Sequence, residues 1–245
     1  MIKQATQKGL LTSHGVTDVF HYAPLHYILF IARSQSLCSK NELRRLGYDI
    51  SHFRRTSRRP DEQRGFSDYV HLTLNQFPPI LKAKLAGGFP HFEVRVRAED
   101  VEKGTVHLCR YNIAKCRFLR RGMKTGFTAS EANGQYHDEK QIPTAETIAE
   151  CNDLLTHNLE RNMIEVLVPR KLELPTNTRL IFFSPPDREL ADELLQPLKL
   201  GWQCQLAKDT TYNAETRCMA KVRLFLDHAI ADPQWRGDGL DFDNV

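Results

Sequence analysis

Short stretches of alternating apolar and polar residues recur along the chain and predict β-strands. The alternation is clearest in residues 69–74. The other predicted strands are residues 17–22, 92–96, 105–110, 163–168, 179–183 and 203–206. Residues 219–230 fit either a helix or a strand, and the alternation of Val222, Leu224 and Leu226 favours a strand.

Apolar residues at helical spacing predict helices between these strands, with a weaker pattern near the N-terminus. The predicted helices are residues 1–12, 24–32, 75–85, 98–101, 143–161 and 187–198. The helix over 143–161 is expected to turn these residues inward: Ile148, Cys151, Leu154, Leu155 and Leu159. Residues 46–66 and 111–142 hold no period and are expected to be long loops.

The order of these elements predicts the fold class. Helices and strands do not alternate regularly, and no linker divides the chain. We therefore expect one α+β domain over residues 1–245, with a core at about 17–185 that the C-terminal elements complete.

Composition narrows the class of protein. The chain has 245 residues, 41% of them hydrophobic, which is enough to bury a core. No apolar run is long enough to span a bilayer, and residues 1–6 lack the apolar segment of a signal peptide. We expect a cytoplasmic protein that does not bind membranes. The six cysteines show no CxxC spacing, which indicates neither a metal site nor a disulfide framework.

The net charge of +4 is distributed unevenly, because basic residues gather in two clusters near aromatic residues. The first cluster is Lys40, Arg44, Arg45, Arg54, Arg55, Arg58, Arg59 and Arg64. The second is Lys115, Arg117, Arg120, Arg121 and Lys124. Arginines contact phosphates and aromatic rings stack on bases, so this pattern suits a nucleic-acid partner. A solvated basic surface is the alternative interpretation of either cluster.

Glu165 is the unusual residue of the predicted strand at 163–168. Its neighbours are apolar, and an ionised carboxylate is costly to bury unless it is paired. If the strand alternates, Ile164 and Val166 share one face while Glu165 and Leu167 share the other. A carboxylate on a solvent-exposed strand edge is the ordinary explanation, and a functional site is the alternative.

Three segments in a fixed order carry a resemblance to a known family. They are Phe20-His21-Tyr22-Ala23-Pro24-Leu25 before a helix, Asp68-Tyr69-Val70-His71-Leu72-Thr73-Leu74 before a proline-containing helix, and the strand with Glu165. This order resembles the DarT family of nucleic-acid ADP-ribosyltransferases, with a Tyr-His-x-Thr strand, an Asp-Tyr-Val strand and a Glu-x-Leu-Val strand. The resemblance covers residues 17–168 and is strongest at 68–74.

The resemblance implies an ADP-ribosyltransferase fold in which two facing β-sheets, flanked by helices, form a cleft for NAD. It implies that Glu165 is the catalytic glutamate and that His21 hydrogen-bonds the adenosine-side ribose. Arg64 is our choice for the catalytic arginine, with Arg58 as the alternative. The remaining residues expected at the NAD site are Tyr22, Ala23, Tyr69, His71 and Phe77.

Some positions depart from the family pattern. Ala23 stands where the family has threonine, and residues 71–74 lack the aromatic residues of some members. No tyrosine begins the following helix, and Phe77 is the candidate to stack on nicotinamide in its place. These departures bear on the substrate more than on the chemistry.

The resemblance implies that the protein transfers ADP-ribose from NAD to a base of single-stranded DNA or RNA. Residues expected to bind the nucleic acid are Arg54, Arg55, Arg58, Arg117, Arg120, Arg121 and Lys124. A role as a toxin or phage-defence effector, with an antitoxin partner, follows from the hazard of this activity. The alternatives are transfer to a protein side chain and a non-catalytic nucleic-acid-binding module.

Overall fold

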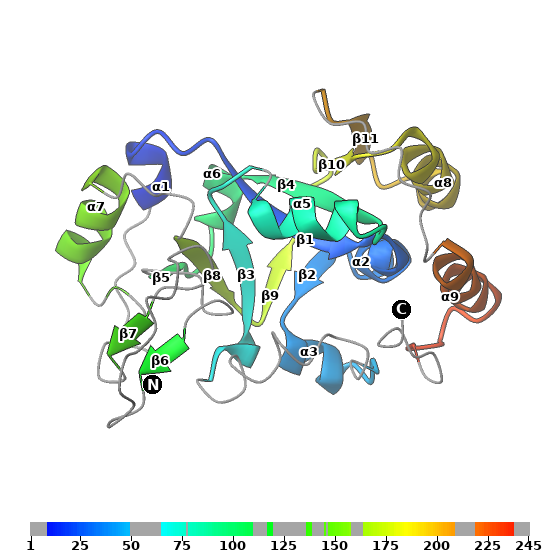
Figure 1. Cartoon of the computed structure of the whole chain (residues 1–245), viewed down its shortest axis with the longest axis horizontal. Coiled ribbons are helices and arrows are strands. Elements are labelled where there is room, and N and C mark those ends of the chain that lie inside the picture. Colours follow the sequence, from blue (N-terminus) through cyan, green and yellow to red (C-terminus); the bar gives the residue numbers. More distant parts are fainter. Residues whose placement is uncertain are drawn as a thin grey trace.

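A seven-stranded β-sheet forms the centre of the protein, seen here in a computed structural model (Figure 1). The structure describes residues 9–49, 65–76, 78–109, 117–119, 136–138, 145, 147–157, 164–208 and 219–237. The strand order is β11-β10-β4-β1-β3-β8-β5. Neighbouring strands are antiparallel except β10 and β11, which are parallel.

The strands of this sheet are β1 (Asp18–Pro24), β3 (Tyr69–Thr73), β4 (His91–Arg97), β5 (His107–Cys109), β8 (Glu165–Pro169), β10 (Arg179–Phe182) and β11 (Gln203–Leu206). Two small sheets accompany it. One pairs β2 (Ser36–Cys38) with β9 (Lys171–Glu173), and the other pairs β6 (Arg117–Leu119) with β7 (Tyr136–Asp138).

Helices surround the large sheet, and Figure 1 shows α5 in front of it, α1 and α7 at one end, and α8 and α9 at the other. The α-helices are α1 (Leu10–Ser13), α2 (Ile28–Ser34), α3 (Lys40–Arg45), α5 (Pro79–Ala86), α6 (Ala98–Val101), α7 (Ile148–His157), α8 (Pro185–Leu195) and α9 (Met219–Ala231). Short 3-10 helices are η1 (Leu25–Tyr27), η2 (Phe66–Asp68) and η5 (Gln196–Leu198).

The two faces of the sheet differ in character. One face packs into the main hydrophobic core, to which Val19, Val94 and Val166 belong. On the opposite face, one row of paired residues crosses six strands: Arg179, Arg95, Phe20, Thr73, Glu165 and Cys109. Paired residues on neighbouring strands point to the same side, so this second face carries Glu165 and is the more polar one.

β1 and β3 separate over most of their length. Their register contains one residue pair, Phe20 with Thr73, whereas β1 pairs with β4 over seven residues, from Asp18 to Pro24. Backbone groups of β3 beyond this pair therefore need partners other than the β1 backbone. This separation lies beside His21 and His71.

Most of the predicted elements are confirmed, and so is the α+β class. The mostly antiparallel sheet is a finding of the structure. The strand predicted at 219–230 is wrong, because α9 buries Val222, Phe225, Leu226 and Ala229, which recur at helical spacing. The two facing sheets and the NAD cleft remain a prediction.

Two further expectations also need correction. The segment 111–142 is not loop throughout, since it contributes β6 and β7. In α7, Cys151 and Leu155 are buried as expected, but Ile148 is 43% exposed because it lies in the first turn of a helix shorter than predicted. Helix α1 covers the end of the segment 1–12, whose first eight residues lie outside the described part.

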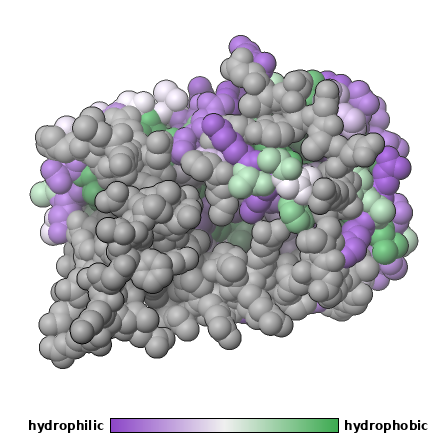
Figure 2. Space-filling view, in the orientation of Figure 1, coloured by the Kyte–Doolittle hydropathy of each residue, from purple (hydrophilic) through white to green (hydrophobic). Residues whose placement is uncertain are grey.

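Few large apolar side chains of the described residues are exposed. They are Leu46, Ile148, Leu206 and, on helix α9, Leu224 and Ile230. On the face shown in Figure 2, polar and apolar residues are interspersed among the coloured atoms. Within the described ranges, no helix combines the length and apolarity needed to cross a bilayer.

Candidate active site

Glu165 lies in the interior of the sheet rather than at its edge. It begins β8, which runs between β3 and β5, and it is paired with Thr73 on one side and Cys109 on the other. The residue is only 7% exposed. Val166 and Val168 anchor β8 in the main core, so the backbone holds Glu165 on the opposite face. The ordinary explanation of a wet strand edge is therefore wrong.

His71 is the neighbour that contacts this carboxylate. Its Nδ1 lies 3.2 Å from Oε2 of Glu165, and its Nε2 lies 3.2 Å from the carbonyl oxygen of Phe66. β3 buries Val70 and Leu72 and leaves His71 partly exposed, so His71 lies on the wetter face of the strand. Both ring nitrogens of His71 thus face oxygen atoms.

His21 contacts the backbone of His71 from the other side of the sheet, since its pairing with Val94 places it on the core face. Its Nδ1 lies 2.9 Å from the backbone carbonyl oxygen of His71, and a carbonyl only accepts, so Nδ1 carries the proton. Burial lowers the pKa of His21 from 6.5 to about 4, and the charge of His71 lowers it further, while the hydrogen bond to His71 opposes the shift. His21 is therefore neutral near pH 7, and its Nε2 has a lone pair suited to accept a hydrogen bond.

These contacts form one hydrogen-bonded chain across three strands, from His21 on β1 through His71 on β3 to Glu165 on β8. The sequence singled out all three residues. It gave no sign that His71 links the other two, because that contact depends on the register between β3 and β8.

Tyr22 follows His21 on β1, and its side chain makes contacts that support the fold. Its hydroxyl donates to the backbone carbonyl of Asn75 and to Glu93, and its ring packs against Leu81 and Leu85 of α5. Burial raises the pKa of Glu93, and Arg95 opposes that shift by pairing with it at 2.6 Å. Tyr22 thus joins α5 to the sheet, and its role in NAD binding remains a prediction.

Ala23 and Tyr69 are the other described members of the predicted NAD site. Ala23 is buried, at 3% exposure, and belongs to the main core. Tyr69 is partly exposed, packs beside Phe66 and meets the ring of His107 edge-on at 5.6 Å. Tyr69 therefore lies on the Glu165 face, whereas Ala23 points into the core.

Several predicted site residues lie outside the described part of the chain. They are Arg54, Arg55, Arg58, Arg64, Phe77, Arg120, Arg121 and Lys124. The backbone of Arg117 forms part of β6, and its side chain is not described. The roles of all these residues remain predictions.

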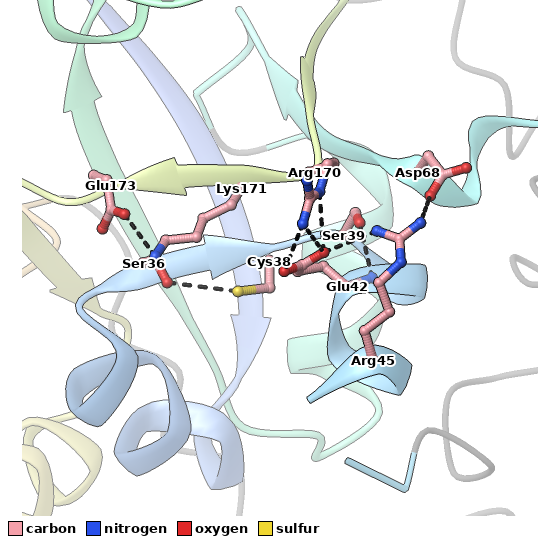
Figure 3. Close-up of polar contacts among 9 residues, drawn as sticks. All are labelled: Ser36, Cys38, Ser39, Glu42, Arg45, Asp68, Arg170, Lys171 and Glu173. Carbon is pink, nitrogen blue, oxygen red and sulfur yellow. Dashed lines mark hydrogen bonds and ion pairs between the residues drawn. The ribbon is translucent and has the colours of Figure 1, made fainter. Parts of the chain in front are cut away.

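A network of ion pairs joins the end of β8 to α3 and η2 (Figure 3). Glu42 accepts from Arg45 at 2.8 Å and from Arg170 at 3.1 Å, and Arg45 also contacts Asp68 at 3.0 Å. The backbone supports the same junction, because Arg170 donates to the carbonyl of Asp68 and Ser39 donates to the carbonyl of Arg170. The junction fixes the end of the strand that carries Glu165 next to the start of β3.

Nothing in the local sequence indicates this junction. Arg170 adopts a left-handed conformation with φ of 60°, which few residues other than glycine favour. Its turn between β8 and β9 brings the guanidinium over Glu42, a residue 128 positions earlier in the chain. Only the tertiary fold creates this pairing.

No family model matches the chain, and no curated protein matches it. Solved structures do match, among them three of DarT from Thermus sp. 2.9. The complex with ADP-ribosylated ssDNA has a TM-score of 0.50 at 15% identity, covering 84% of this chain and 98% of that one. The complex with NAD+ has a TM-score of 0.48 at 15% identity, and the match covers 79% of this chain and 96% of that one. The complex with carba-NAD+ has a TM-score of 0.46 at 13% identity, and the match covers 79% of this chain and 97% of that one. The match to the ssDNA complex shows that this protein has a DarT-like fold.

Proposed function

We propose that this protein is an NAD-dependent ADP-ribosyltransferase that modifies a base of single-stranded DNA. The observation that carries the proposal is the chain from His21 through His71 to Glu165, placed where β1 and β3 separate. The DarT-like fold supports it, since the similar structure is a DarT in complex with ADP-ribosylated ssDNA.

Glu165 would stabilise the reacting ribose. When the bond between nicotinamide and ribose breaks, its electron pair leaves with nicotinamide and positive charge develops on the ribose. A carboxylate held rigidly on a strand and shielded from water stabilises such charge strongly. The base nitrogen then supplies the electron pair of the new bond to the ribose, and the proton of that nitrogen passes to Glu165.

His21 would position NAD rather than exchange protons. Its Nδ1 is committed to the carbonyl of His71, and the depressed pKa keeps the ring neutral. Its Nε2 is then an acceptor for a ribose hydroxyl. An arginine of the first basic cluster, Arg64 or its alternative Arg58, would hold the pyrophosphate.

The biological role we propose is that of a toxin or phage-defence effector with an antitoxin partner. Adding a bulky, negatively charged group to a base blocks the enzymes that copy or translate nucleic acid. A cell that makes such an enzyme needs a means to restrain or reverse it.

The test uses NAD labelled in its adenylate part, incubated with the protein and separate pools of single-stranded DNA, RNA and cell protein. We expect label in the DNA pool and release of nicotinamide. Labelling of RNA instead of DNA would identify RNA as the target. Labelling of protein alone would refute the proposal that the protein modifies nucleic acid. Oligonucleotide binding without nicotinamide release would identify a non-catalytic module.

Glu165→Gln is the decisive variant, because it keeps the size of the side chain and removes the charge. We expect transfer to fall by a factor of at least about 100, as for loss of a charged group acting in the transition state. Glu173→Gln, on the short strand β9 that follows β8, serves as the matched control. Full activity of Glu165→Gln would refute the assignment.

A further inference from the structure

The hydrogen-bonding partners of His71 define its protonation state. Nε2 faces the carbonyl oxygen of Phe66 at 3.2 Å, and a carbonyl only accepts, so Nε2 must carry a proton. Nδ1 faces Oε2 of Glu165 at 3.2 Å, and these two atoms need one proton between them. The imidazole is the more basic of the two groups, so this proton belongs on His71. His71 and Glu165 therefore form an imidazolium–carboxylate pair.

We propose that His71 is a positioning residue for Glu165: its imidazolium donates from Nδ1 to Oε2, fixes the orientation of the carboxylate and keeps it ionised. This inference rests on the proposed function, in which Glu165 acts in its charged form. His71 keeps its proton throughout, since the proton of the acceptor base passes to Glu165 and not to the ring.

The geometry suits this role. Glu165 is 7% exposed, and burying a carboxylate is costly unless it is paired and hydrogen-bonded. His71 is that partner on the adjacent strand, diagonally across the pairs Thr73 with Glu165 and His71 with Leu167. The carbonyl of Phe66 holds the far side of the ring, so the imidazole cannot turn away without losing a second hydrogen bond.

Further titratable groups lie near His71. His21, on β1, donates to the backbone of His71 and is neutral near pH 7. His107, on β5, lies across Leu167 in the same row, and burial lowers its pKa. Tyr69, on the same strand, has its pKa raised by burial. These three groups are neutral near pH 7. Asp68, an acidic residue just before β3, pairs with Arg45, whereas Glu165 contacts the His71 ring directly at 3.2 Å.

The first measurement needs no substrate. The ring proton of His71 is followed by NMR during a pH titration of the unsubstituted protein and of Glu165→Gln, with His71→Asn providing the assignment. We expect His71 to titrate at least about one pH unit lower in Glu165→Gln, since an opposite charge at this distance shifts a titration by about that much or more. Identical titrations in the two proteins would overturn the proposal.

The second measurement is the pH profile of transfer from NAD to a mixed-sequence single-stranded DNA oligonucleotide. In His71→Leu we expect kcat to fall about tenfold or more, with a smaller change in KM for NAD, and the acid limb of kcat/KM to move up by about one pH unit. His71→Asn offers an amide N–H at the Nδ1 position, so it should recover part of kcat while keeping the shifted limb. If the acid limb of kcat/KM in His71→Leu stays where it is in the unsubstituted protein, the proposed positioning role of His71 is refuted.

His107→Asn is the matched control, since it removes a ring from the same row on the other side of Leu167. Its acid limb should stay in place, and an equal shift there would overturn the specific role of His71. If Glu165→Gln is fully active, the proposed function itself fails. If Glu165→Gln is inactive while the His71 titration is the same with and without the carboxylate, the inference about His71 alone fails.

Discussion

The neutral state of His21 makes a quantitative prediction about acid stability. An unfolded chain protonates His21 as the pH falls through about 6.5, whereas the folded protein resists protonation until about pH 4. Between these values the unfolded state binds more protons, so the free energy of unfolding decreases as the pH falls. Well above about pH 6.5, His21 is neutral in both states and does not lower the free energy of unfolding. Below about pH 4 it is protonated in both states, and its destabilising contribution no longer changes with pH.

The magnitude follows from the two pKa values. From about pH 7 to about pH 5, proton linkage at one such histidine costs about 2 kcal/mol of stability. His21 as a whole residue is partly exposed, and nearby water reduces the cost of charging the ring, so we expect about 1 to 2 kcal/mol.

His21→Asn isolates this contribution. The asparagine amide can donate to the carbonyl of His71 in place of Nδ1 but does not titrate. Urea unfolding followed by tryptophan fluorescence gives the free energy of unfolding of both proteins at about pH 7 and about pH 5. The unsubstituted protein should lose about 1 to 2 kcal/mol more than His21→Asn over this interval. The same loss in both proteins would refute the argument that burial keeps His21 neutral.

Three further predictions concern stability and are measured by the same unfolding assay. Phe92→Ala should cost about 3 to 5 kcal/mol, because Phe92 is fully buried and stacks on Phe182 at 5.6 Å; a cost below about 1 kcal/mol would contradict its place in the core. Arg170→Gly should change the free energy of unfolding by less than about 1 kcal/mol. Glycine adopts the left-handed conformation without strain, which offsets the loss of the ion pair with Glu42. A loss of stability above about 2 kcal/mol would contradict this balance. Tyr22→Phe should cost about 1 to 3 kcal/mol by leaving the buried Glu93 without one donor, and a neutral effect would show that Arg95 alone satisfies that carboxylate.

The sequence predicted those parts of the fold that depend on local patterns. The strand containing Val70 and Leu72 was found because apolar residues alternate and are bounded by polar residues. Residues 219–231 misled the same reasoning, because Val222 and Leu226 fit both an alternating and a helical spacing. Phe225 and Ala229 fit the helix alone, and their burial decides for α9.

The candidate site was predictable residue by residue but not as an arrangement. Glu165 was conspicuous as a carboxylate in an apolar run, and His21 through its place in the motif order. The contact between His71 and Glu165 joins residues 94 positions apart and requires the register in which β3 pairs with β8. The pairing of Arg170 with Glu42 likewise requires a left-handed turn that nothing in the local sequence indicates.

The separation of β1 from β3 and the candidate site are one structural feature. The register of β1 with β3 contains the pair of Phe20 with Thr73, and next to it the imidazole of His21 donates to the backbone carbonyl of His71. This side chain bridges the two strands, and the same carbonyl belongs to the residue whose ring contacts Glu165. Replacing His21 with a residue that cannot donate should therefore disturb Glu165 through β3, although the two side chains lie on different strands. His21→Leu should shift the NMR signals of the His71 ring and reduce transfer, whereas His21→Asn should leave the His71 signals near their original positions. Equal displacement of these signals in both variants would show that the imidazole, and not its hydrogen bond, holds the strands in place.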